Sequence, residues 1–155
     1  MLARASDARA FCYTFSMITK IQYILIYLSS LIPAFLLDMV WLGFISPDLY
    51  QSQIGHLFAE NINWMVGLSF YLMFPIGLII FVIIPALHKR SLKKALLYGA
   101  LFGFFCYMTY DLTNWATLKD WPALISFIDM AWGTFLAMTV SGITYIVSSK
   151  YIVKT

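Results

Sequence analysis

Charge is scarce in this sequence. Of 155 residues, ten are Lys or Arg and seven are Asp or Glu, whereas 62% are hydrophobic and 18% are aromatic. A soluble domain of this size needs more polar surface, and a mean hydropathy of +0.83 is typical of a membrane protein. The basic residues stand at the ends of apolar runs rather than in one patch, so the net charge of +3 indicates membrane topology and no nucleic-acid partner.

Paired cysteines and the motifs of soluble enzymes are also lacking. The two cysteines, Cys12 and Cys106, form no CxxC motif, which argues against thiol-disulfide chemistry. The chain has no phosphate-binding glycine loop, no HExxH and no GxSxG. His56 and His88 lie outside the apolar runs, which argues against a membrane haem held by two imidazoles. The sequence therefore identifies no cofactor. A divalent metal is one possibility, since the carboxylate oxygens of the chain are suitable ligands for it.

Four long apolar runs are what the chain does have. They cover residues 21–45, 64–87, 95–118 and 122–147, and each is long enough for the roughly 20 residues of a membrane-spanning helix. The sequence predicts an all-α integral membrane protein whose four transmembrane helices form a single domain over residues 21–155. Residues 1–20 form an N-terminal arm, in which Met17 is an alternative start of translation.

Basic residues mark one side of the predicted bundle. They precede the first run, fill the loop between the second and third runs, and follow the fourth: Arg4, Arg9, Lys20, Lys89, Arg90, Lys93, Lys94, Lys150 and Lys154. Both termini are therefore expected in the cytoplasm. On the other side, Ser46-Pro47-Asp48 has the pattern of a helix N-terminus with Ser46 as the N-cap. Apolar residues recur at helical spacing from there to Asn61. We expect a short interfacial helix between the first two spans, placed as a lid.

Three aspartates, Asp38, Asp111 and Asp129, interrupt three different apolar runs. An ionisable side chain at the centre of a membrane helix costs roughly 2.5–3.5 kcal/mol, so such residues usually face the bundle interior. In the expected topology, all three lie about 10 Å below the outer surface, at about 1.5 Å per residue. Either they form a shared polar site, or they are neutral, hydrogen-bonded carboxylic acids that only stabilise the bundle.

A tryptophan follows each aspartate on the same helix face, in Asp38-Met-Val-Trp41, Asp111-Leu-Thr-Asn-Trp115 and Asp129-Met-Ala-Trp132. The motifs at Asp38 and Asp129 lie on helices that are expected to run in opposite directions. Their similarity is therefore either a weak inverted repeat, as in some transporters, or chance. Tyr107 and Asn114 share an arc of the third helix with Asp111. The candidate proton- or cation-binding residues are Asp38, Asp111, Asn114 and Asp129, with walls formed by Tyr107, Trp41, Trp115 and Trp132.

Small residues and prolines predict how the helices meet. Gly99 and Gly103 form a small-xxx-small pair, which allows close helix packing. Pro33 and Pro75 lie inside the first two spans, where a missing N–H donor favours a kink and frees a carbonyl near Ser29 and Tyr71. Such carbonyls could serve as ligands.

Four segments, residues 37–43, 50–57, 109–122 and 129–134, carry a resemblance to a known family, and the Tyr-Asp-Leu-Thr-Asn block at 110–114 is the most specific part. Over about residues 21–147 the chain resembles the small bacterial inner-membrane proteins known as domain of unknown function 2177. The resemblance implies a multi-pass protein of the bacterial inner membrane and adds no established activity. The arm before Met17 departs from the family pattern, in which the first span begins almost at once.

Three classes of function suit a buried group of carboxylates, an amide and aromatic rings. The first is binding or translocation of a proton or a small cation, in which Asp111 is the principal site and aromatic faces add cation–π attraction. The second is an intramembrane enzyme in which Asp38 and Asp111 act on lipid headgroups. The third is a non-catalytic partner, as a homodimer or beside another membrane protein. In each case the lipid bilayer is a partner.

Overall fold

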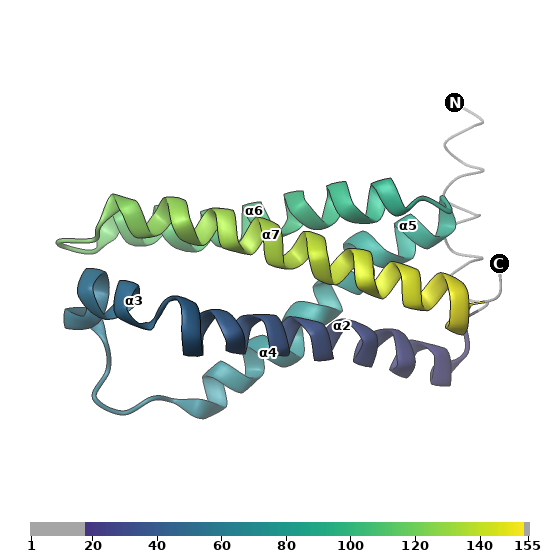
Figure 1. The fold of residues 1–155 in the computed structure, drawn as a ribbon, viewed down its shortest axis with the longest axis horizontal. Coiled ribbons are helices and arrows are strands. Elements are labelled where there is room, and N and C mark those ends of the chain that lie inside the picture. Colours follow the sequence, from purple (N-terminus) through teal and green to yellow (C-terminus); the bar gives the residue numbers. More distant parts are fainter. Residues whose placement is uncertain (1–17, 154–155) are drawn as a thin grey trace.

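The computed structural model describes residues 18–153 and shows a bundle of helices (Figure 1). Four helical stretches in this part of the chain are long and apolar enough to cross a membrane: Lys20–Ile45, Trp64–His88, Leu92–Thr117 and Ala123–Ile152. Their ends agree with the four predicted runs to within five residues. The expectation of an all-helical chain with four candidate spans is therefore confirmed.

Three of the four spans contain a turn of π-helix. The first consists of α2 (Lys20–Val40) and the turn Trp41–Ile45. The second consists of α4 (Trp64–Leu78), the turn Ile79–Ile83 and α5 (Ile84–His88). The third is α6 (Leu92–Thr117), and the fourth is α7 (Ala123–Val147) with the turn Ser148–Ile152. Extra residues in a π-turn redirect the side chains that follow, and such turns are frequent near functional sites.

The short helix expected between the first two spans is α3 (Pro47–Ile54), which ends in a 3₁₀ turn at Gly55–Leu57 rather than reaching Asn61. Pro47 occupies its first turn and Asp48 supplies the acidic side chain, as predicted. Ser46 is the N-cap residue, but the expected cap hydrogen bond is not made. Its hydroxyl instead donates to the carbonyl of Trp41 at 2.9 Å, and so closes the preceding π-turn.

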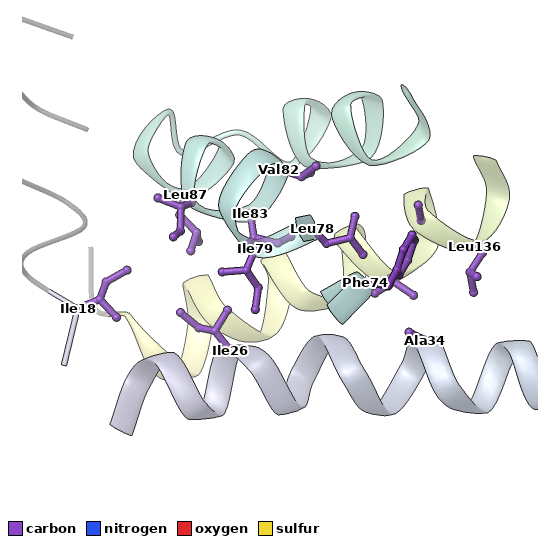
Figure 2. Close-up of a cluster of buried hydrophobic side chains, with 13 residues drawn as sticks. Ile18, Ile26, Ala34, Phe74, Leu78, Ile79, Val82, Ile83, Leu87 and Leu136 are labelled. Atoms are coloured by element: carbon purple, nitrogen blue, oxygen red, sulfur yellow. The ribbon is translucent and has the colours of Figure 1, made fainter. Parts of the chain in front are cut away.

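The main apolar core lies between α2, the second span and α7. Figure 2 shows side chains of the second span facing Ile26 and Ala34 of α2, with Leu136 of α7 beside them. Ile18 and Val153 belong to the same cluster, and Gln22 donates to the carbonyl of Ile152 at 2.6 Å. Both ends of the described chain therefore meet at one end of the bundle, while α3 and the turn between α6 and α7 lie at the other (Figure 1).

The outward faces of the spans are apolar as well. Phe44, Met65 and Phe127 are 84%, 75% and 61% exposed, respectively, and other large apolar side chains surround the bundle in the same way. Water would penalise so much exposed apolar area, whereas lipid chains match it. The composition of this surface supports a chain embedded in a membrane.

Helices α6 and α7 approach each other through small residues. A Cβ atom added to Gly103 would collide with the carbonyl of Gly133, and one added to Gly99 would lie 2.5 Å from Oγ of Ser141. Gly133, Ala137 and Ser141 are spaced four residues apart on α7, opposite the Gly99 and Gly103 pair of α6. The predicted small-xxx-small contact is therefore present, with a matching stripe on the partner helix.

Candidate functional site

Asp38 lies on the buried face of α2, three residues before the first residue of the π-turn, and is 5% exposed. Its carboxylate accepts two hydrogen bonds from other spans. The Tyr71 hydroxyl of α4 donates to Oδ2 at 2.6 Å, and the Trp132 indole of α7 donates to Oδ1 at 3.1 Å. These two donors fix the carboxyl group between three helices.

Asp129 lies on α7 and is 6% exposed. Its Oδ1 accepts a short hydrogen bond from the hydroxyl of Tyr50, which is on α3. The same Tyr50 oxygen accepts a hydrogen bond from the Trp41 indole at 3.1 Å. Burial, together with the hydrogen bond to Asp129, raises the pKa of Tyr50 above its usual range. Tyr50 therefore stays a neutral donor, and it attaches the short helix to the membrane-spanning bundle.

The two Asp-x-x-Trp motifs are connected crosswise. Trp132 of the second motif donates directly to Asp38 of the first, and Trp41 of the first reaches Asp129 of the second through Tyr50. Between them the Trp41 and Trp132 rings stack, with centroids 4.4 Å apart and planes 9° from parallel. The likeness of the two segments thus corresponds to a shared arrangement in space, on helices that run in opposite directions (Figure 1).

A cavity of about 940 Å³ adjoins this group. Asp38, Asp129, Trp41, Trp132, Tyr50, Tyr71 and Tyr107 all contribute to its lining. The rest of the lining is mostly apolar and comes from the π-turn after α2, α3, the segment after it, the first half of α4, and α6. Among the described residues that line the cavity, none is Lys, Arg or His. Two buried carboxylates therefore face a large, mainly apolar space that contains no cationic side chain of its own.

Asp111 lies apart from this cavity, although it is fully buried on α6. Asp129 and Ser126 of α7 are its polar neighbours, but neither carboxyl oxygen forms a hydrogen bond of ordinary geometry. The hydroxyl of Ser126 accepts a hydrogen bond from the indole of Trp121 at 2.9 Å, which leaves its own proton directed to no other described partner than Asp111. An ionised carboxylate in this position is costly in a low-dielectric interior, because no cation and no well-formed hydrogen bond to it is present among the described residues.

The remaining predicted residues divide into two groups. Trp41, Trp132 and Tyr107 line the cavity, whereas Asn114 and Trp115 do not. Trp115 is 42% exposed and packs edge-on against Phe127. Within the described chain, no group of three or more His, Cys, Asp or Glu side chains has the arrangement of a metal site. The divalent metal stays a prediction.

Tyr50 and Tyr71 are the functional candidates that the sequence analysis missed. A signal for Tyr50 was present, because it repeats at helical spacing with Ile54 on the face of α3 that turns toward the bundle. No such signal marks Tyr71, since α4 is apolar on every face and its sequence gives no preferred orientation.

Four apolar spans around a buried pair of carboxylates define a small multi-pass membrane protein with an internal polar site. Residues 23–146 match the family model described as "Predicted membrane protein (DUF2177)", and the chain belongs to this family. Neither the curated proteins nor the solved structures contain a match to the chain.

Proposed function

We propose that this protein binds a small cation, a protonated or quaternary amine, beside Asp38 and Asp129, as the binding step of transport across the membrane. The observation that carries the proposal is the meeting of two buried carboxylates from different spans at one cavity that no Lys, Arg or His of the described chain lines. Their hydrogen-bond donors, Tyr50, Tyr71 and Trp132, orient the carboxyl groups without supplying positive charge.

Aromatic rings supply the second part of the attraction. The stacked Trp41 and Trp132 and the ring of Tyr107 are part of the same lining as the carboxylates. A cation within about 6 Å of an aromatic face gains roughly 0.5–2 kcal/mol, most when it is desolvated. Carboxylates beside aromatic faces suit an organic cation better than a bare metal ion, which prefers several oxygen ligands.

Asp111 is the candidate for the proton in the proposed cycle. It is buried, lacks a hydrogen bond of ordinary geometry, and has Asp129 as an electrostatic neighbour. Two carboxylates in one low-dielectric region repel each other when both are charged. A proton on Asp111 therefore removes this repulsion and lets Asp129 stay ionised. Asn114, three residues further along α6, is the proposed orienting group.

The distribution of charge supports a direction for the bundle. The start of α2, the turn between α5 and α6, and the π-turn after α7 lie at the end where the described chain begins and ends (Figure 1). These segments carry Lys20, Lys89, Arg90, Lys93, Lys94 and Lys150. We propose that this end faces the cytoplasm of a bacterium, by the positive-inside rule. The cavity then lies toward the outer side of the inner membrane, with α3 at the outer interface as its cover.

The proposal is tested by thermal unfolding of the purified protein in detergent with increasing tetraethylammonium. A ligand that binds only the folded state stabilises it by about 2.7 kcal/mol at 100 times its dissociation constant. We expect a rise in Tm for the wild type and for Asp48→Asn, an exposed acidic residue outside the cavity. We expect the rise to be lost in Asp38→Asn and in Asp129→Asn. Equal Tm shifts in all four proteins, or no shift in the wild type, would contradict the proposal. Parallel titrations with Mg²⁺ and Mn²⁺ test whether the site binds a divalent metal instead.

A further inference from the structure

The cavity extends from the carboxylates to the lipid-facing side of the bundle. Its lining includes Val66 and Phe70 of α4, which are 64% and 43% exposed, and Tyr110 of α6, which is 56% exposed. Helices α4 and α6 meet further along, where the rings of Phe74 and Phe102 have centroids 5.6 Å apart. Toward its N-terminus α4 leaves the other spans (Figure 1).

This divergence gives the cavity an opening between two membrane-spanning helices. Val66 and Phe70 belong to the candidate span Trp64–His88, and Tyr110 and Cys106 belong to the candidate span Leu92–Thr117. A gap between two such helices opens to lipid rather than to water. A ligand can therefore reach the carboxylates from within the bilayer.

The chemistry of the lining restricts the ligand further. A phosphate-containing lipid would bring its negative group near Asp38 and Asp129, and no Lys, Arg or His of the described lining is present to neutralise it. An apolar chain, in contrast, matches the exposed aliphatic and aromatic side chains at the opening. A volume of about 940 Å³ is sufficient for a head group together with part of a chain.

We propose that the ligand is an amphipathic monocation, a long-chain amine or quaternary ammonium compound without a phosphate, which enters sideways from the lipid. This inference depends on the proposed function, because it uses the same carboxylates to hold the positive head. The chain of the ligand lies between the first half of α4 and α6, and the head lies between Asp38 and Asp129.

Three probes separate the features of such a ligand: tetramethylammonium, dodecyltrimethylammonium and dodecylphosphocholine. Binding is measured to the protein in nanodiscs of a zwitterionic lipid, with empty nanodiscs subtracted. The dodecyl cation partitions into the bilayer at the opening, so its apparent dissociation constant is expected to be at least about ten-fold below that of tetramethylammonium. Dodecylphosphocholine, with the same chain and a phosphate, is expected to bind at least about ten-fold more weakly than the dodecyl cation.

A variant at Gly67 tests the route of entry. Gly67 lines the cavity on α4, and a Cβ there meets no heavy atom within 4 Å, so the side chain of Gly67→Phe starts in open space and is chosen to obstruct the opening. Gly43 has equally open surroundings but does not line the cavity, which makes Gly43→Phe the matched control. We expect Gly67→Phe to remove the advantage of the dodecyl chain and Gly43→Phe to keep it.

A measurement that needs no change at the cavity uses Cys106, which is exposed and lines the opening. In a Cys12→Ser background it is the remaining cysteine of the sequence. The dodecyl cation should slow its alkylation by N-ethylmaleimide several-fold, and tetramethylammonium at its own saturating concentration should not.

The outcomes distinguish this inference from the proposed function. If tetramethylammonium and the dodecyl cation bind equally well, and both lose affinity in Asp38→Asn, the cation site stands and the lipid route is wrong. A dodecyl advantage that persists in Gly67→Phe, or Cys106 alkylation that neither ligand slows, also overturns the lipid route. If neither cation binds, both proposals fail.

Discussion

At the scale of single residues, the site depends on neutral donors around two carboxylates. Asp38 is held by Tyr71 and Trp132, and Asp129 is held by Tyr50. Because each donor comes from a different helix than its acceptor, the hydrogen bonds also tie the bundle together. A buried carboxylate that loses its donor incurs a desolvation penalty of about 1–3 kcal/mol.

Trp132→Phe tests this dependence most simply. The change keeps an aromatic ring next to Trp41 but removes the N–H that donates to Asp38. We expect the free energy of unfolding to fall by about 1–3 kcal/mol, measured by equilibrium denaturation in mixed micelles. Trp64→Phe is the control, since Trp64 is 76% exposed, and its effect should stay within about 0.5 kcal/mol. An equal effect of both substitutions would show that ring size, not the hydrogen bond, stabilises the site.

Because of Tyr50, the stability of the folded protein depends on pH in the alkaline range. Burial and the Asp129 hydrogen bond raise its pKa, so above about pH 10 the unfolded chain loses this proton while the folded chain keeps it. The folded state then binds more protons, and its stability falls as the pH rises. Tyr50→Phe should make the decline in Tm above about pH 10 shallower. Tyr151→Phe, at a side chain that is 79% exposed, should leave the decline as steep as in the wild type.

At the scale of elements, proline and polar side chains connect one helix to the next. Pro33 has no N–H to donate to the carbonyl of Ser29, one turn earlier in α2. The hydroxyl of Thr144 on α7 donates to this carbonyl at 3.1 Å. The free carbonyl that the sequence predicts at Ser29 therefore has a hydrogen-bond donor within the bundle.

A double-mutant cycle measures this link between α2 and α7. Thr144→Val should cost about 1 kcal/mol in the wild type, because the Ser29 carbonyl loses its donor. The cost should fall in a Pro33→Ala background, where the backbone N–H of residue 33 can satisfy that carbonyl. We expect a coupling energy of about 0.5–1 kcal/mol from denaturation of the four proteins.

Thr134→Val serves as the control for the cycle, because the Thr134 hydroxyl donates to Met130 within its own helix. Its coupling to Pro33→Ala should be close to zero. Coupling of equal size at both threonines would mean that proline acts on the whole bundle and not through Ser29.

At the scale of the whole molecule, the spans could be predicted because length and hydropathy alone define them. The end of the fourth span was missed by five residues, because Ser148, Ser149 and Lys150 continue the helix as a π-turn despite their polarity. Depth along each helix was also predictable, at a constant rise per residue. It predicts one level for Asp38, Asp111 and Asp129, and in the structure Asp129 is an electrostatic neighbour of both other aspartates.

Rotation about the helix axes could not be predicted in the same way. Spans that are apolar on most faces carry little periodic signal, so the sequence could not show that Asp111 faces Ser126 rather than the cavity. It also could not show that Tyr71 points toward Asp38. Tertiary packing between the small residues of α6 and α7 determines this rotation, and that contact depends on two helices at once.

The central claim is that a cation binds between Asp38 and Asp129, and the most direct test is to locate one. Crystals grown with tetraphenylarsonium, a lipophilic monocation, would reveal the arsenic atom by its anomalous scattering. We predict one dominant peak inside the cavity, between the two carboxylates and beside the stacked rings of Trp41 and Trp132. The peak should disappear in crystals of Asp38→Asn. A peak elsewhere on the protein, or an unchanged peak in the variant, would contradict the account.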